Sequence, residues 1–318
     1  MEVFIGLKKL PKRFKGSVVT LGVFDGVHRA HQKIISTAVA DARKNNAPAL
    51  CISFDPHPRT IKTGVDEGSV RVLTTMKEKI RYLENLNLDG VLFLDITDKF
   101  LNLRAEEFIE KILHNKMNTS EIVVGYNYRF GKGREGDTNL LEKMGKKFNY
   151  KTKVVDSFKI DGNIVSSTLI RELIREGNIE KANKMLGKPY CIIGHVGRGD
   201  QIGRQIGFAT ANVMVRDSDK LLPGNGVYFT EITFEGERHF GICNVGVRPT
   251  FGENQKEIEV HILGLDKKDL YDKEVRLQFH ERMRDEEKYD SVELLVEQIK
   301  KDKEEGLKKI SKYEMEDN

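Results

Sequence analysis

Apolar and polar positions in the first half of the chain follow two alternating periods. Short apolar runs, typical of buried strands, are followed by segments whose apolar residues recur every three or four positions, as in helices. The pattern predicts strands at 17–24, 47–54, 90–94, 121–124 and 151–155, and helices at 28–40, 75–86, 105–115 and 138–148. Strands that alternate with helices favour a parallel sheet covered on both faces. Ligands of such sheets bind beyond the carboxyl ends of the strands.

Two further helices are predicted before residue 187, one opened by Ser166 and one that begins near Gly177 and is ended by Gly187. Beyond residue 187 the pattern changes. Short strands are then predicted at 191–196, 209–214, 226–234, 238–245, 258–262 and 274–279. Their regular spacing favours a barrel or a sandwich, and a one-sided apolar pattern predicts a closing helix over 291–313. We therefore expect two domains, residues 1–186 and 187–318, and 318 residues suffice for two cores.

Composition narrows the possible partners. The 53 basic and 49 acidic residues give a net charge of only +4, so we expect no strongly basic surface for binding nucleic acid. The three cysteines lie far apart in apolar runs, so we expect buried, reduced thiols and a cytoplasmic protein without zinc or disulfides. The sequence shows neither a signal peptide nor an apolar run near the roughly 20 residues of a membrane span.

The first candidate site lies where the first predicted strand meets its helix. Residues 20–31 read T-L-G-V-F-D-G-V-H-R-A-H, a strand, a glycine turn and a helix start. Unpaired N–H groups and the positive dipole end of a helix bind phosphate. His28 and His31 are three positions apart and share one face of a first helical turn. An ordinary turn with two surface histidines fits the same residues, and the pattern alone leaves both interpretations open.

Two other segments follow predicted strands of the same sheet. In Phe54-Asp-Pro-His-Pro58, two prolines stiffen a loop that carries His57, although a rigid surface turn is the simpler interpretation. The glycine-rich segment after Gly125 carries Asn127, whose amide can read the edge of a base or flavin, together with Arg129. A solvated loop with its basic residues turned outward is the alternative there.

A serine-rich helix start completes the first half. Residues 165–171 read V-S-S-T-L-I-R, and hydroxyl and N–H groups at a helix start bind phosphate beside a fixed cation. The residues concerned are Ser166, Ser167, Thr168 and Arg171. Most such segments are only capped helices.

The second half holds a glycine-rich segment over 194–212 that lacks the Gly-Lys-Ser/Thr of a Walker loop. Its backbone N–H groups suit phosphates, and a flexible β-loop is the alternative. Thr210 and Asn212 are two apart, so on a strand they face one side, and their neutral oxygens suit Mg²⁺ held by nucleotide phosphates. Glu259 and His261 share a strand face in the same way, where an exposed carboxylate would also be ordinary.

Taken in order, these segments resemble the signatures of the bacterial bifunctional riboflavin kinase/FMN adenylyltransferases, or FAD synthetases. The resemblance covers roughly residues 15–305 and includes G-V-F-D-G-V-H-R-A-H, F-D-P-H-P, S-S-T-L-I-R, G-R-Q-I-G-F-A-T-A-N, N-V-G-V-R-P-T-F and E-V-H-I. Two positions depart from the family pattern: Ala30 replaces a glycine and Ala209 replaces a proline. Neither change removes a chemically essential group.

The resemblance implies an α/β nucleotidyltransferase domain with a Rossmann-like parallel sheet, then an antiparallel β-barrel riboflavin kinase domain with a C-terminal helix. The barrel would phosphorylate riboflavin to FMN with ATP and Mg²⁺, and the first domain would adenylylate FMN to FAD with release of pyrophosphate. The resemblance assigns nucleotide or flavin binding to Gly22, Phe24, Asp25, His57, Asn127, Arg129, Ser166, Ser167, Thr168, Gly197, Gly203, Arg204, Gly207, Arg248 and Arg284. It assigns catalysis to Glu259, His28, His31 and Arg171, and the metal to Thr210 and Asn212.

Two alternatives accompany this hypothesis. Ala30 or Ala209 would mark a protein that keeps only one of the two activities. A non-catalytic flavin-binding regulator would keep the fold and lose turnover, but the near-neutral charge and the intact Glu259, His28 and His31 favour the enzyme.

Overall fold

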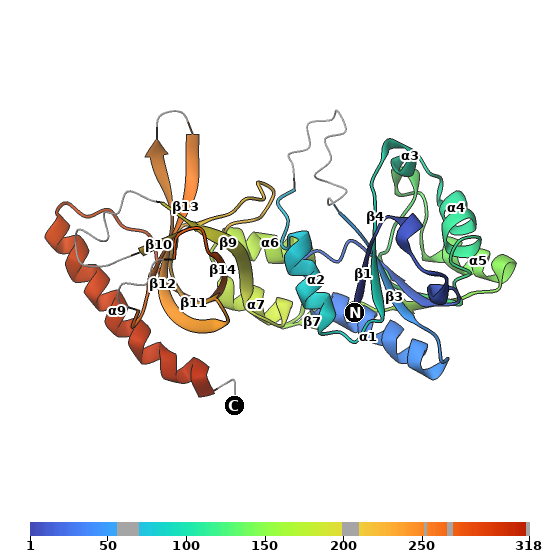
Figure 1. The fold of residues 1–318 in the computed structure, drawn as a ribbon, viewed down its shortest axis with the longest axis horizontal. Coiled ribbons are helices and arrows are strands. Elements are labelled where there is room, and N and C mark those ends of the chain that lie inside the picture. Colours follow the sequence, from blue (N-terminus) through green and yellow to red (C-terminus); the bar gives the residue numbers. More distant parts are fainter. Residues whose placement is uncertain (56–69, 199–209, 251–252, 266–269, 316–318) are drawn as a thin grey trace. The chain divides into compact units, whose positions relative to one another are not determined.

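The computed structural model describes residues 1–55, 70–198, 210–250, 253–265 and 270–315. The chain divides into two compact units, Met1–Ser167 and Thr168–Asn318 (Figure 1). We predicted a boundary between functional domains after residue 186, which lies two helices beyond the division of the structure after Ser167. The boundary between the functional domains stays a prediction.

The first unit is built on a parallel sheet of six strands in the order β1-β4-β3-β2-β5-β6. The strands are β1 (Glu2–Ile5), β2 (Val18–Leu21), β3 (Ala49–Phe54), β4 (Gly90–Leu94), β5 (Glu121–Gly125) and β6 (Lys151–Val155). The α-helices are α1 (Arg29–Lys44), α2 (Met76–Glu84), α3 (Asp98–Leu101), α4 (Ala105–Phe108) and α5 (Thr138–Phe148). Shorter elements are the 3₁₀ turns η1 (Leu7–Lys9), η2 (Lys12–Phe14) and η4 (Lys132–Arg134), the π-helical η3 (Ile109–His114) and a hairpin of β7 (Lys159–Ile160) and β8 (Asn163–Ile164).

The central strands are apolar throughout because both faces of the sheet are buried. Alternate residues of β3 go to opposite sides: Leu50 and Ile52 join one core cluster, whereas Ala49 and Cys51 join the other. The first cluster includes residues of α4, η3 and α5, and the second includes residues of α1 and α2. The predicted parallel sheet with two covered faces is confirmed.

The strand order determines which loops meet. The chain moves from β2 to β3 and β4 in one direction, and β5 then pairs with the other side of β2. Such a reversal leaves a crevice at the carboxyl ends of the strands, where ligands of open α/β sheets bind. The carboxyl ends of β3, β2 and β5 are therefore neighbours, and each precedes a segment with predicted binding residues.

The second unit contains a closed antiparallel barrel with the strand order β10-β13-β12-β11-β14-β9. The strands are β9 (Tyr190–Gly197), β10 (Thr210–Met214), β11 (Gly226–Phe234), β12 (Glu237–Thr250), β13 (Glu253–Ile262) and β14 (Glu274–Arg284). Helices α6 (Ser167–Arg175) and α7 (Ile179–Leu186) precede the barrel, and α9 (Val292–Met315) follows it. The structure thus selects the barrel from the two architectures that strand spacing allowed.

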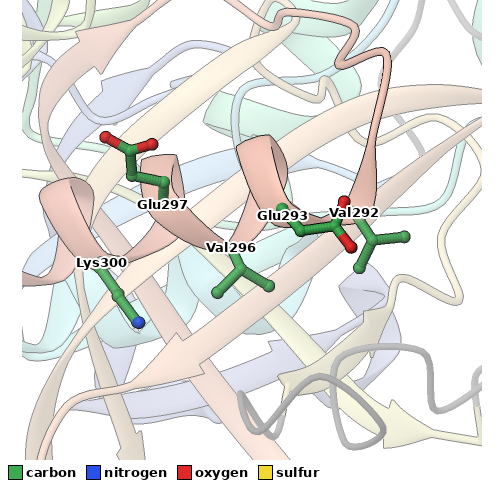
Figure 2. Close-up of a pocket in the computed structure, with 5 residues that line it drawn as sticks. All are labelled: Val292, Glu293, Val296, Glu297 and Lys300. Carbon is green, nitrogen blue, oxygen red and sulfur yellow. The ribbon is translucent and has the colours of Figure 1, made fainter.

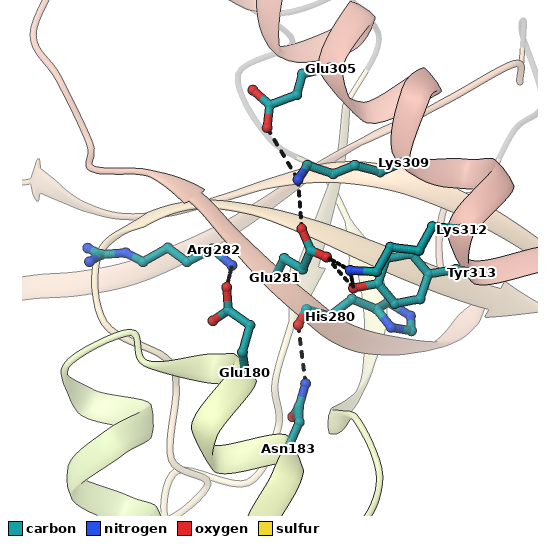
Figure 3. A network of polar contacts seen from close by, with 9 residues as sticks. All are labelled: Glu180, Asn183, His280, Glu281, Arg282, Glu305, Lys309, Lys312 and Tyr313. Carbon is teal, nitrogen blue, oxygen red and sulfur yellow. Dashed lines mark hydrogen bonds and ion pairs between the residues drawn. The ribbon is translucent and has the colours of Figure 1, made fainter. Parts of the chain in front are cut away.

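Helix α9 is held on the outside of the barrel by apolar and ionic contacts. Ile310 and Tyr313 pack against a barrel cluster that includes Phe229 and Ile242. Figure 3 shows the ionic part: the Glu281 carboxylate accepts hydrogen bonds from Lys309 and from the Tyr313 hydroxyl, each at 2.6 Å, and from Lys312. Helix α7 is attached to the same strand through Asn183, whose amide donates to the His280 carbonyl at 3.3 Å, as Figure 3 shows, and to the Phe279 carbonyl at 2.8 Å.

Candidate functional site

The segment between β2 and α1 has a backbone conformation that L residues rarely adopt. The φ angle is +50° at Phe24, +83° at Gly26 and +41° at Val27. A positive φ at an aromatic or β-branched residue costs about 1–3 kcal/mol and persists only where neighbouring groups hold it. Strain of this kind is concentrated at ligand-binding segments.

Asp25 holds this segment in place. Its side chain is buried, and the carboxylate accepts hydrogen bonds from the backbone N–H groups of Leu73 and Thr74, both at 3.0 Å, and from the Thr74 hydroxyl at 3.2 Å. The Thr74 hydroxyl in turn accepts a hydrogen bond from the Gly26 N–H. The Ser167 hydroxyl donates to the Asp25 carbonyl at 3.0 Å, so Ser167 lies beside this turn. Direct nucleotide binding by Asp25 stays a prediction.

The two histidines form one stacked pair. Their ring centroids are 3.5 Å apart with an angle of 17° between the planes, which confirms that they share a face. His28 caps α1 and does not begin it, because its Nδ1 accepts a hydrogen bond from the His31 N–H at 3.3 Å. A neutral His28 ring whose Nδ1 accepts carries its proton on Nε2, which can donate to an oxyanion. The edge of the Phe24 ring packs on His31, with centroids 5.2 Å apart.

The other predicted residues of the first unit have varied surroundings. A Cβ at Gly22 would lie 2.9 Å from the Phe24 ring, so this position has no space for a side chain. Asn127 is exposed directly after β5, and Arg129 forms an ion pair with Asp137 at 3.3 Å.

The serine-rich segment continues from Ser166, which precedes α6, into the helix. Thr168 is exposed and Arg171, one turn later, is buried. His57 lies outside the described residues.

The barrel carries a polar row across three neighbouring strands. Asn212 on β10 pairs in register with Glu259 on β13, which pairs with Asn244 on β12. Directly opposite residues share a face, with Cβ atoms about 5 Å apart. The adjacent positions Ala211 and Val260 are buried inside the barrel, so the row lies on the outer face.

Thr210 and His261 form the next pair of the same face. The predicted alternation, with Thr210 beside Asn212 and Glu259 beside His261, is thereby confirmed as geometry. Asn244 was not among the predicted residues. Its signal was present in the sequence, because it opens the segment that leads to Arg248.

The remaining predicted residues of the second unit are placed in part. Gly197 pairs with Asn212, and the sulfur of Met214 lies over the position where a Cβ of Gly197 would be. Arg284 donates to both carboxylate oxygens of Asp302 on α9, at 2.8–3.2 Å, so its guanidinium attaches the helix. Arg248 pairs with Gln255 along β12 and β13, while Gly203, Arg204 and Gly207 lie outside the described residues.

The donor set of the barrel row suits a metal that arrives with a nucleotide. Within the described parts of the chain, no group of three or more His, Cys, Asp or Glu side chains is placed to hold a metal. Thr210 and Asn212 offer neutral oxygens, the ligand type that hard cations bound to phosphate oxygens accept, and their role as metal ligands stays a prediction.

Two further observations concern surfaces outside these clusters. A shallow hollow lies along one side of α9, and every residue that lines it comes from that helix (Figure 2). The lining residues are Val292, Glu293, Val296, Glu297 and Lys300, none of which was predicted to bind substrate. No helix within the described residues has the length and apolar character needed to cross a membrane.

Comparison with known proteins matches each half of the chain to a separate family. The FAD synthetase family matches residues 10–169, and the riboflavin kinase family matches residues 186–310. The chain belongs to the bifunctional riboflavin kinase/FMN adenylyltransferase family. A relative with that name from Buchnera aphidicola subsp. Schizaphis graminum is 36% identical over 95% of this chain and 96% of its own length. Those of Escherichia coli (strain K12) and Bacillus subtilis (strain 168) are 36% and 33% identical, over 91% and 93% of each chain.

A solved structure agrees with this riboflavin kinase/FMN adenylyltransferase assignment in its fold. It is described as a macrolide-efflux protein from Streptococcus pneumoniae, is 30% identical, and superposes with a TM-score of 0.86 over 96% of this chain and 98% of its own. The FAD synthetase match contains the histidine pair, and the riboflavin kinase match contains the barrel row.

Proposed function

We propose that this chain converts riboflavin to FMN with one ATP, and FMN to FAD with a second ATP. The observation that carries the proposal is that each compact unit holds its own polar cluster, inside the part of the chain that its own family model matches. We assign FMN adenylylation to residues 1–186 and riboflavin phosphorylation to residues 187–318. The matches to 10–169 and 186–310 support this division.

The barrel row provides the groups for phosphoryl transfer. The riboflavin 5′-hydroxyl attacks the γ-phosphorus of ATP, a new O–P bond forms, and the bond to the bridging oxygen of ADP breaks. The hydroxyl is neutral and weakly acidic, so the attack benefits from a base, and Glu259 takes its proton. Asn212 and Asn244 flank Glu259 in register and orient its carboxylate.

Thr210 and Asn212 would hold Mg²⁺ together with the phosphates of ATP. A bound Mg²⁺ neutralises the negative charge of these phosphates. The two side chains orient the nucleotide on the barrel face beside Glu259.

The first unit provides the groups for nucleotidyl transfer. The FMN phosphate attacks the α-phosphorus of ATP, and pyrophosphate leaves. This nucleophile is already anionic, so the step needs charge stabilisation and no base. The Nε2–H of His28, the ring of His31 and the N-terminus of α1 stabilise the phosphates, and the Ser167 hydroxyl lies beside the same turn.

We place the protein in the cytoplasm. Cys51, Cys191 and Cys243 are all free and buried, as expected of a protein that works in a reducing compartment. Burial raises the pKa of the Cys51 and Cys243 thiols, and nearby Glu259 raises that of Cys243 further, so both stay protonated and unreactive.

The deciding experiment separates the two activities in one protein. Glu259→Gln keeps the size of the side chain and removes the base. We expect riboflavin phosphorylation to fall roughly 10²- to 10⁴-fold. Conversion of FMN to FAD by the same preparation should stay unchanged. Glu257→Gln, on the same strand and face, is the matched control and should retain both activities.

Each product pattern has a distinct meaning. Full kinase activity in Glu259→Gln would refute the role of Glu259, and equal loss of both activities would refute two separate sites. If the wild-type protein binds flavin but forms neither FMN nor FAD with Mg²⁺ and ATP, the regulator alternative is correct. FAD formed only from added FMN, or FMN without FAD, would identify a protein with one activity.

A further inference from the structure

A buried lysine lies at the carboxyl end of the parallel sheet. Lys79 on α2 is 3% exposed, and its ammonium donates to the carbonyl of Phe54 at 3.4 Å. Phe54 is the last residue of β3, so the ammonium lies at the carboxyl end of the sheet. The ring of Phe93 is 5.9 Å from Nζ and covers another side of it. A buried charge of this kind is costly unless it is paired.

Two carboxylates at this end of the sheet interact with the Lys79 charge. Asp25 follows β2 and Asp55 follows β3, and both attract the ammonium electrostatically. Asp25 is itself buried, so its charge is poorly screened by water. Two uncompensated carboxylates at this end of the sheet would repel a triphosphate that binds beside His28.

We propose that Lys79 is a positioning residue for FMN adenylylation, whose buried ammonium neutralises Asp25 and Asp55 so that the triphosphate of ATP can bind beside His28. The inference rests on the proposed site at the His28–His31 pair. Lys79 takes no direct part in the proposed transfer of the adenylyl group, and its ammonium acts through Asp25 and Asp55.

If Lys79 has this role, the KM for ATP should depend on the protonation of its ammonium. Burial lowers the pKa of Lys79, while the negative charges of Asp25 and Asp55 oppose the shift. The titratable groups that interact with the ammonium are Asp25 after β2, Asp55 after β3 and Cys51 on β3, whose thiol stays protonated, and β4 contributes the uncharged Phe93. Lys79 thus loses its proton below the usual value of 10.5, and the KM for ATP should rise as the pH approaches that range.

The test uses Lys79→Met in the full-length chain. We expect the KM for ATP in FMN adenylylation to rise about tenfold, as is typical of coupled neighbouring charges, with little change in kcat. The alkaline rise of that KM should disappear, and riboflavin phosphorylation should be unaffected. Lys77→Met, an exposed position on the same helix, is the matched control and should behave as wild type.

A second variant, Asp55→Asn, tests the charge interaction even if Lys79→Met does not fold. In Lys79→Met, the additional change Asp55→Asn should lower the raised KM for ATP part of the way to the wild-type value, because it removes one of the two carboxylates that Lys79 no longer neutralises. Asp55→Asn alone should move the alkaline rise of the wild-type KM to lower pH, because Lys79 then has one carboxylate fewer. This last measurement does not need a folded Lys79 variant.

The outcomes that overturn the inference differ from those that overturn the proposed site. A wild-type KM in Lys79→Met, a loss of kcat without rescue by Asp55→Asn, or an alkaline rise that Asp55→Asn does not move would refute the role of Lys79. Unchanged adenylylation in His28→Ala would refute the site itself.

Discussion

Single residues of the first unit show how local strain is held by distant contacts. Asp25 was predicted from its motif as a binding residue, and its carboxylate accepts hydrogen bonds from Leu73 and Thr74, far along the chain. Periodicity cannot reveal such a contact, because it depends on how the segment before α2 returns to the sheet. The stacking of His28 on His31 was predictable, because three-residue spacing at a helix start is a local property.

Gly131, in the glycine-rich segment after β5, gives a prediction at this scale. Its φ is +76°, and an added Cβ would lie 2.7 Å from the backbone of Ala105. Gly133 also has a positive φ, +59°, but no atom lies within 4 Å of its added Cβ. Gly131 combines this φ with a ψ of 177°, a region that only glycine adopts readily, whereas Gly133 has a ψ of 16° and lies in the left-handed region. Gly133→Ala should lower the free energy of unfolding by about 1–2 kcal/mol, and Gly131→Ala by more, because of both its backbone conformation and its contact with Ala105. Urea unfolding of both variants measures the difference, and equal losses would refute a tight contact with Ala105.

Helix α9 is the element whose attachment depends most on charge. Glu281 has three hydrogen-bond donors on α9, and Arg284 holds the buried Asp302 (Figure 3 shows the Glu281 part). Burial by itself would raise the pKa of Glu281, but the bonds from Lys309, Lys312 and Tyr313 prevail and lower it to about 2. The ionised carboxylate is thus the form that binds the helix.

This shift predicts an acid-sensitive attachment. A carboxyl whose pKa falls from 4.5 in the unfolded chain to about 2 in the folded one stabilises the fold fully above pH 4.5, and that contribution disappears as the pH falls toward 2. Glu281→Gln should lower the free energy of unfolding by about 2 kcal/mol at pH 7. The loss should shrink as the pH falls from 4.5 toward 2, measured by urea unfolding at several pH values. Glu305→Gln is the control, because the Glu305 carboxylate forms an ion pair with Lys309 at 3.3 Å and is exposed.

Most elements of both units follow from their sequence patterns, and the exceptions have physical reasons. The strands at 90–94, 151–155 and 226–234 and the helix at 138–148 were predicted with the bounds that the structure has. The helix expected over 105–115 is α-helical only to Phe108 and π-helical beyond, which apolar spacing does not distinguish. The edge strand β1 was missed, because its short and half-exposed sequence has no clear period.

At the scale of the whole molecule, the histidine pair and the barrel row are carried by separate units. The histidine pair lies in Met1–Ser167 and the barrel row lies in Thr168–Asn318. Each family match likewise covers one of the two sites. This separation implies that a defect in one site leaves the other intact.

Mixing two defective full-length proteins tests this independence. Glu259→Gln should make no FMN from riboflavin, and the double variant His28→Ala/His31→Ala should make FMN but no FAD. We expect the mixture, with Mg²⁺ and ATP, to form FAD from riboflavin, because FMN released by one protein is adenylylated by the other. Chromatography of the flavins over time measures this. FMN that accumulates in the mixture without FAD would contradict free exchange between the two sites.

The sequence by itself determined the kinds of element, the change from an α/β to a β pattern, and the residue types of both sites. These are local properties, set by hydrophobic period, turn residues and spacing along one strand or helix. The long-range contacts come from the tertiary structure: β2 and β5 are neighbours, the barrel closes, Asn244 lies beside Glu259, and the buried Lys79 interacts with Asp25 and Asp55. Strand pairing and the burial of charge depend on residues far apart in the chain, so no local pattern carries them.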